Sequence, residues 1–139
     1  MSKIFNMPSC IISLIGGVAS YMLGGWDVLL KALVALVILD YITGVLKGIY
    51  RKKLSSDIGF RGLIKKIIIF IVVATANIVS GILSDSIPLR DVVIIFFISN
   101  EGISLLENAA EFIPVPQKLK DVLVQLRDNS DKENMEEGE

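Results

Sequence analysis

The chain has no histidine and only one cysteine, Cys10, among its 139 residues. Without histidine it lacks the commonest general base and metal ligand, and a single cysteine cannot close an internal disulfide. The sequence also lacks a glycine-rich phosphate loop and a nucleophile paired with a base. We therefore expect a protein that is not an enzyme and that has no cofactor or metal site.

A charge excess of one sign is missing as well, because the formal net charge is only -1. Aromatic residues make up 7% of the chain and do not alternate with its basic residues. Proteins that bind single-stranded nucleic acid combine a positive groove with aromatic side chains on which bases stack. We predict no nucleic-acid partner.

What the sequence has in abundance is apolar residues, which form 53% of the chain and give a mean hydropathy of +0.64. Four apolar stretches cover residues 9–25, 28–46, 67–83 and 92–110. Each has about 17 to 19 residues, and a helix of about 20 residues crosses a bilayer whose hydrocarbon offers the backbone no hydrogen-bond partner. We predict an all-α integral membrane bundle of four transmembrane helices, or three if the first stretch lies in the interface.

The first two stretches are separated by GGWD, residues 24–27. Two glycines favour a turn, and Trp26 stands where an aromatic anchor at the membrane interface belongs. The segment predicts a tight helical hairpin. The N-terminal segment has Lys3 but no A-x-A cleavage site, so we expect it to remain in the mature chain.

The basic residues predict the orientation in the membrane. Twelve of the 14 Lys and Arg residues fall at the N-terminus, between residues 47 and 66, or after residue 117, and the exceptions are Lys31 and Arg90. The positive-inside rule places the 47–66 loop and both termini in the cytoplasm. Residues 54–66 begin with Ser55 or Ser56 as a helix N-cap and predict a basic amphipathic helix on the inner leaflet. The residues expected to anchor the chain there are Arg51, Lys52, Lys53, Arg61, Lys65 and Lys66.

The C-terminal part divides into two segments after a transmembrane domain of residues 1–113. Residues 114–127 open with prolines and then have apolar residues at helical spacing, which predicts a short cytoplasmic amphipathic helix against the membrane or a partner. Residues 128–139 are acidic and almost without apolar residues, so we expect a disordered tail.

One polar face is predicted on the second apolar stretch. Asp40 shares a helical side with Thr43, Gly44 and Lys47. An aspartate in hydrocarbon is costly unless it meets protein or water. Asp40 therefore either pairs with a neighbouring helix and holds the bundle together, or faces a pore.

The fourth stretch has a longer polar stripe at three- and four-residue spacing. Its members are Asn100, Glu101, Ser104, Glu107, Asn108 and Glu111. Either this is an ordinary amphipathic helix that enters the cytoplasm, with its span ending near Ser99, or the stripe lines an aqueous lesion. A single copy would leave Glu101 in lipid, so the stripe also favours association of several copies.

Small and polar residues recur at four-residue spacing in three stretches. The pairs are Gly16 with Ser20, Gly44 with Gly48, and Asn77 with Gly81. Small residues let helix backbones approach closely in lipid, and Asn77 adds a polar contact between helices. We predict helix packing at these positions and a homo-oligomer in the bilayer.

The run ILDYITGVLKGIYRKKLSSDIGFRGLIKKI, residues 38–67, resembles phage holins of the clostridial toxin-secretion and phage-lysis type. Its D-Y-x-T-G element, basic loop, L-S-S-x-x-G-x-x-G element and paired lysines carry the resemblance. Residues 100–122 are similar to the C-terminal half of that family, so the resemblance covers residues 27–126. It implies a small protein of the bacterial cytoplasmic membrane that assembles into lesions. Endolysin, or a toxin in some relatives, passes as cargo without specific binding.

Two alternatives to this function remain open at this point. The chain can be a small ion or proton channel lined by Asp40 and Glu101, or a membrane scaffold that recruits soluble partners through residues 114–127. The resemblance also implies a hypothesis about Met7, since some holin genes use two starts. A product that begins at Met7 lacks Lys3, and the alternative is an incidental methionine.

Overall fold

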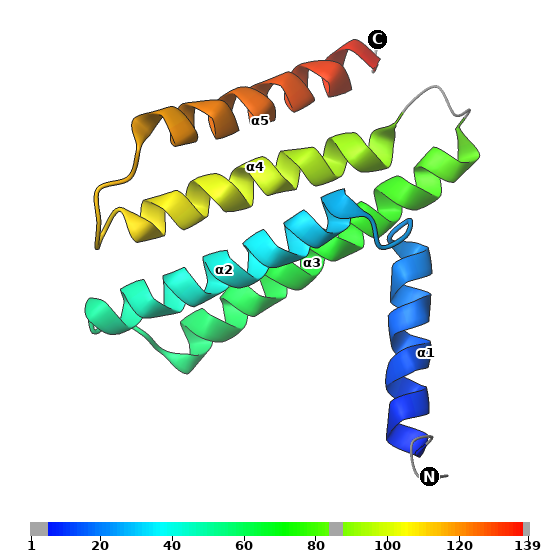
Figure 1. Cartoon of the computed structure of the whole chain (residues 1–139), viewed down its shortest axis with the longest axis horizontal. Coiled ribbons are helices and arrows are strands. Elements are labelled where there is room, and N and C mark those ends of the chain that lie inside the picture. The colour runs from blue at the N-terminus through cyan, green and yellow to red at the C-terminus, as the bar shows by residue number, and fades with distance from the viewer. Residues whose placement is uncertain (1–5, 84–87, 138–139) are drawn as a thin grey trace.

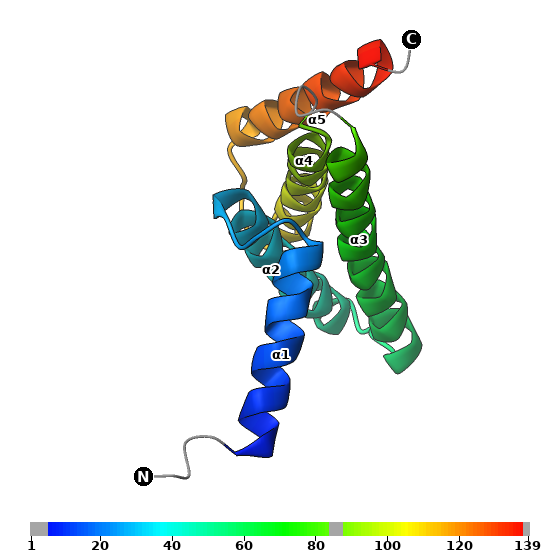
Figure 2. The same cartoon turned by 90° about the vertical axis from the view of Figure 1, so that its right-hand side faces the viewer.

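The computed structural model describes residues 6–83 and 88–137, which form five α-helices. They are α1 (Met7–Met22), α2 (Val28–Tyr50), α3 (Ser56–Ile82), α4 (Leu89–Ala109) and α5 (Gln117–Glu137). The predicted all-α class is confirmed. Helix α4 lies in the middle of the bundle, with α2 and α3 on one side and α5 on the other (Figures 1 and 2).

Three of the helices begin at a side chain that accepts a hydrogen bond from the first turn. Asn6 accepts from the Ser9 amide, Asp27 from the Leu30 amide and Ser55 from the Ile58 amide, at 3.1, 2.9 and 3.2 Å. Such caps satisfy amides that have no partner inside the helix. The predicted N-cap at Ser55 is therefore confirmed.

Helix α3 is longer than the sequence pattern indicated. Residues 56–66 are its first turns, and the helix continues without a break to Ile82, over 27 residues. A separate amphipathic helix over 54–66 was thus the wrong prediction. The stretch contains Gly59 and Gly62 but no proline, and an isolated glycine costs a helix only about 1 kcal/mol.

The number of membrane-spanning helices is not confirmed as four. By length and composition, α2 and α3 are the two described helices able to cross a membrane. Helix α1 has 16 residues, or about 24 Å at 1.5 Å per residue, which is shorter than a hydrocarbon core of about 30 Å. Helix α4 is not one of these two, and it has four charged residues, although it runs alongside α2 and α3.

The turn between α1 and α2 forms, but the predicted hairpin does not. Gly24 and Gly25 have φ angles of 87° and 100°, which favour glycine. The chain changes direction at this turn, so that α1 projects from the bundle. Helix α1 meets α3 only near the turn (Figures 1 and 2). None of the residues of α1 is buried. Trp26 is 54% exposed.

The apolar core lies where α2, α3 and α4 meet. Leu33, Val37, Val73 and Ile94 form its buried centre. No large apolar side chain of α4 is exposed, whereas α1, α2 and α3 expose many. Those on the outer sides of α2 and α3 include Ile38, Leu39, Ile42, Leu46, Ile67, Ile68, Ile71 and Ile78. A soluble monomer rarely exposes an apolar surface of this extent.

Helix α5 also differs from the sequence prediction. It begins after Pro116 and runs to Glu137, so residues 128–137 are helical instead of disordered. This part contains neither glycine nor proline, and adding residues to an existing helix costs far less than starting one. The hydroxyl of Ser130, which is buried, donates to the Leu126 carbonyl at 2.9 Å. The segment is part of a helix that packs along α4.

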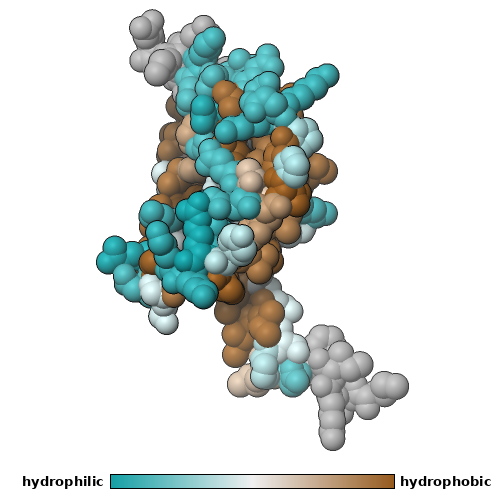
Figure 3. Space-filling view, turned by 90° about the vertical axis from the view of Figure 1, so that its left-hand side faces the viewer, coloured by the Kyte–Doolittle hydropathy of each residue, from teal (hydrophilic) through white to brown (hydrophobic). Residues whose placement is uncertain are grey.

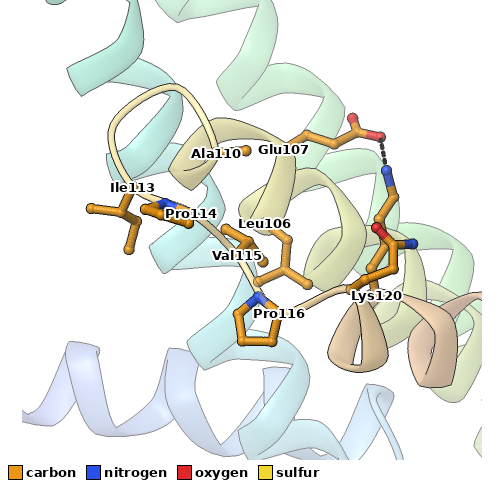
Figure 4. A pocket seen from close by; sticks show the side chains of 9 residues that line it. Leu106, Glu107, Ala110, Ile113, Pro114, Val115, Pro116 and Lys120 are labelled. Atoms are coloured by element: carbon orange, nitrogen blue, oxygen red, sulfur yellow. Dashed lines mark ion pairs between the residues drawn. The ribbon is translucent and has the colours of Figure 1, made fainter.

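The link between α4 and α5 folds around a small cavity of about 200 Å³. Pro114 and Pro116 keep the link out of a helical conformation, and Lys120 then pairs with Glu107 of α4 at 3.9 Å (Figure 4). This arrangement turns the chain back, so that α5 runs antiparallel to α4.

Candidate functional site

Three charged side chains from three helices meet inside the bundle. The Lys66 ammonium of α3 donates to Glu101 of α4 at 2.6 Å and also to Asp40 of α2. The three side chains are 16%, 9% and 7% exposed, in that order. Buried charges are tolerated when they are paired and hydrogen-bonded. We call these three residues the ion cluster.

The ion cluster lies at one level of the bundle. Along the helix axis, Asp40 lies about 18 Å from the first residue of α2, at 1.5 Å per residue. Glu101 lies at the same distance from the first residue of α4. A hydrocarbon core is about 30 Å thick. If α2 and α4 both cross the bilayer, the ion cluster is inside the hydrocarbon and nearer the end of the bundle that has the α2–α3 turn.

Asn108 extends these polar contacts toward the end of α4. Its side-chain nitrogen donates to Asp40 Oδ1 at 3.0 Å and to Thr43 Oγ1 at 3.1 Å. The Thr43 hydroxyl donates in turn to the Leu39 carbonyl at 2.9 Å. Asp40 thus has partners on both α3 and α4, as the pairing alternative for this residue predicted.

The last contacts join α2 to the end of α4. Arg51 donates twice to the Glu111 carboxylate, once from Nε at 3.2 Å, and Lys47 lies 3.9 Å from the same carboxylate. We call the whole series the polar ladder. Its residues are the ion cluster with Thr43, Asn108, Glu111, Lys47 and Arg51.

The other predicted polar residues of α4 lie outside this series. Ser104 lines a groove of about 490 Å³ beside Asp40 and Lys66. Asn100 is half-buried, and Glu107 points to α5, where it pairs with Lys120 (Figure 4). The polar residues of the α4 stripe therefore do not share one neighbour, because they face α2, α3 and α5.

The predicted packing positions have different surroundings. A β-carbon on Gly44 would lie 3.7 Å from the Asn108 side chain, and one on Gly48 would lie 3.2 Å from Leu54. At Gly16 and Gly81 it would meet nothing within 4 Å, and Ser20 is half-buried. Of these glycines, only Gly44 faces another helix of the bundle.

The predicted anchoring residues do not all lie on the surface. Lys66 belongs to the ion cluster, which corrects its assignment as an anchor, and Arg51 binds Glu111. Lys52, Lys53 and Lys65 are exposed, and Arg61 is exposed beside Asp57 at 3.2 Å. Figure 3 faces the end of the bundle that has the α2–α3 turn, where hydrophilic residues gather next to apolar sides.

A second polar centre, at the opposite end of the bundle, was missed by the sequence analysis. The Arg90 guanidinium donates to the Leu23 carbonyl at 2.8 Å, to the Gly25 carbonyl at 3.0 Å and to both Asp27 oxygens. It also reaches Asp91 at 3.1 Å. We call this the arginine hub. The hydrogen bond that Asp27 accepts from Arg90 lowers the pKa of the Asp27 carboxyl below its ordinary value.

The hub attaches the α1–α2 turn to α4, and Asn77 strengthens the attachment from α3. The Asn77 amide donates to the Met22 carbonyl at 2.9 Å. The predicted polar contact of Asn77 is therefore to backbone at the end of α1. Two of the hub's acceptors are also backbone carbonyls, which leave no signal in the sequence. The acids at positions 27 and 91 were the residues that could have indicated the hub.

Among the side chains that the structure describes, in residues 6–83 and 88–132, no group of three or more acidic or cysteine side chains is placed to hold a metal ion. The ladder carboxylates instead have lysine, arginine and asparagine partners.

Comparison with known proteins agrees with the architecture. Residues 17–128 match the bacteriophage holin family. The chain belongs to this family. It is 33% identical over 103 residues to a probable holin of Bacillus phage phi105, covering 73% of this chain and 76% of that protein. The resemblance predicted from residues 27–126 is confirmed, and the ladder and the hub both lie inside the family match.

Other relatives share most of the chain's length. It is 40% identical over 128 residues to an uncharacterized 14.9 kDa protein of Clostridium perfringens, covering 91% of this chain and 97% of that protein. It is 43% identical over 110 residues to an uncharacterized protein of Listeria innocua, covering 78% and 79%. No solved structure matches the chain.

Proposed function

We propose that this protein is a holin that crosses the bacterial cytoplasmic membrane several times, with the α2–α3 turn in the cytoplasm. Copies associate in the bilayer and form lesions through which an endolysin or a toxin passes without a specific binding site. The observation that carries the proposal is a paired ion cluster enclosed by helices whose outer sides are apolar. Such an arrangement suits a bundle with lipid around it.

Apolar surface and basic residues support the membrane placement. Helices α2 and α3 have 23 and 27 residues, enough to cross, and their outer sides expose isoleucine and leucine. Lys52 and Lys53 are exposed at the α2–α3 turn, where the positive-inside rule places the cytoplasm.

The reason for association differs from the one expected from sequence. Glu101 is paired with Lys66 within one copy, so a single copy does not leave this carboxylate in lipid. Unpaired charge is therefore not what drives copies together. Helix α1 offers another reason, because it projects from the bundle with Gly16 uncovered, and small residues allow close packing by a helix of another copy.

An ion channel is the competing function that a specific observation favours. The polar ladder runs from Glu101 to Arg51 and resembles the cytoplasmic half of an ion path. Beyond the ion cluster, however, the same helices pack through Leu33, Val37, Val73 and Ile94. This apolar core closes the path within one copy, so a lesion between copies explains the structure better.

Flux distinguishes the two functions. The chain is induced in bacteria with and without a co-expressed endolysin that lacks a secretion signal, while culture density and membrane potential are recorded. A holin gives abrupt lysis only when endolysin is present, together with loss of the potential. Loss of the potential without release of endolysin would favour the channel and refute the proposal.

The scaffold function can be tested in the same cells. Helix α5 leaves Leu119, Val122 and Leu126 exposed to 48%, 47% and 41%, which a soluble partner can contact. Replacing these three leucine and valine residues with serine keeps the helix and removes the contact. Unchanged lysis in this variant argues against a recruited partner.

A further inference from the structure

Helix α5 accompanies α4 over its whole length. Lys120 pairs with Glu107 near one end of α4, and Leu123 covers Gly102, where a β-carbon would lie 3.0 Å from Leu123 Cδ1. At the other end, Asp131 borders a small cavity with residues 93, 96 and 97 of α4. Each helix has 21 residues, or about 30 Å, which is close to the thickness of a hydrocarbon core.

The outer side of α5 is charged, unlike the outer sides of α2 and α3. Its exposed ionic side chains are Lys118, Asp121, Asp128 and Lys132. Helix α5 packs on α4, on the side away from α2, so this charged face and the apolar faces point in different directions (Figures 1 and 2).

Lipid cannot cover such a face. Charged residues deep in a bilayer are far more costly than a leucine or valine is favourable, so the four exposed charges of the outer side outweigh the three exposed apolar residues of α5. If α4 crosses the membrane, α5 lies beside it at the same depth. Its outer face then needs water at membrane depth, and a lesion supplies that water.

We infer that the outer face of α5 lines the aqueous lumen of the lesion, with α4 behind it and α2 and α3 toward lipid. The inference rests on the proposed holin function. The outer face has charges of both signs, with Lys118 and Lys132 against Asp121 and Asp128. A lumen of mixed charge passes ions with little selectivity and does not retain a folded protein of either net charge.

Attachment of a bulky polymer tests which face lines the lumen. Cys10, which is exposed, is first changed by Cys10→Ser. Single cysteines are then introduced by Asp121→Cys or Asp128→Cys on α5, and by Ile71→Cys on α3 as the control, since Ile71 is 53% exposed on the apolar side. The full chain is reconstituted in vesicles that contain a small dye and a folded fluorescent protein. A polyethylene glycol maleimide is then added.

The expected result is loss of fluorescent-protein release after modification at position 121 or 128, with dye release retained. Position 71 should leave release unchanged. Efficient modification at both α5 positions with unchanged protein release overturns the inference, while release by the unmodified chain keeps the proposed function intact. If the unmodified chain releases no protein, both the function and the inference fail.

A disulfide tests whether α5 stays on α4 in the lesion. A β-carbon on Gly102 would lie 3.7 Å from Leu123 Cγ, so Gly102→Cys with Leu123→Cys in the Cys10→Ser chain places two thiols together. The oxidised variant should release the fluorescent protein as well as its reduced form does. Release that is lost on oxidation and restored by reduction overturns the inference, and Gly102→Cys alone controls for the substitution.

Discussion

The two ends of the bundle hold their helices together by different means. At the end with the α2–α3 turn, the polar ladder joins side chain to side chain, as in the pairs of Lys66 with Asp40 and Glu101. At the opposite end, the arginine hub joins one side chain to backbone carbonyls of a glycine turn. An apolar core that includes Leu33 and Ile94 separates the two.

This difference determines which substitutions each end of the bundle tolerates. Within the ladder, the carboxylates of the ion cluster are paired with Lys66 of another helix, so removing this lysine leaves buried charge. The hub depends on the shape of a turn, because a guanidinium fits several acceptors only when they are correctly placed. The ladder should therefore respond most to charge, and the hub to geometry.

Loss of Lys66 should have the largest effect. Lys66→Met leaves the Asp40 and Glu101 carboxylates buried without their cation, and breaking a buried ion pair costs about 3–5 kcal/mol. Denaturant titration in mixed micelles measures the free energy of unfolding. The triple change Lys66→Met, Asp40→Asn and Glu101→Gln should recover most of the loss. Equal destabilisation in both variants would show that charge pairing is not the main contribution of Lys66.

Loss of Arg90 should have the next largest effect. Arg90→Met removes the hydrogen bonds to the Leu23 and Gly25 carbonyls and to Asp27, with an expected cost of about 2–3 kcal/mol in the same titration. Arg90→Lys keeps the charge but cannot reach several acceptors at once, so it should recover only part of the loss. Full recovery by lysine would contradict a geometric role for the guanidinium.

The turn glycines give a matched pair with a smaller effect. Gly24→Ala places a β-carbon 2.6 Å from the Asn77 side chain at a φ of 87°, whereas at Gly25, with a φ of 100°, it meets nothing within 4 Å. Both changes strain the backbone, which costs about 1–3 kcal/mol, but only Gly24→Ala also disturbs the hub. We expect a lower thermal midpoint for Gly24→Ala than for Gly25→Ala. Equal midpoints would mean that space beside Arg90 does not matter.

The contrast between ladder and hub also explains what the sequence could predict. Asp40 and Glu101 were identifiable because acids inside apolar stretches are costly and occur at helical spacing. Their shared partner was not, since Lys66 lies in a basic run where surface anchoring was the simpler interpretation. The hub left almost no signal in the sequence, because every residue has a backbone carbonyl, whatever its type.

Helix ends were predictable to the extent that local chemistry determines them. The cap at Ser55 followed from its residue type, and the turn at Gly24 from two adjacent glycines. The direction of α1 relative to α2 depends on tertiary contacts of Arg90 and Asn77 at this turn, which the pattern of apolar residues does not contain. The helical conformation of residues 128–137 was not predicted, because their acidic composition alone favours disorder. The helix that precedes them and continues through them is not visible in that composition.

Acid should remove a small part of the hub's contribution. The pKa of Asp27 is lowered, so its charged form stabilises the folded state at neutral pH, and this stabilisation is lost as the pH falls from about 3.8 through the lower folded pKa. Asp27 is 48% exposed, and solvent screening limits the effect to below about 1 kcal/mol. Asp27→Asn keeps an N-cap and removes the charge. The thermal midpoint of the native chain should therefore exceed that of Asp27→Asn at pH 7 and approach it in acid. A difference that persists in acid would assign the effect to the cap and not to the ion pair with Arg90.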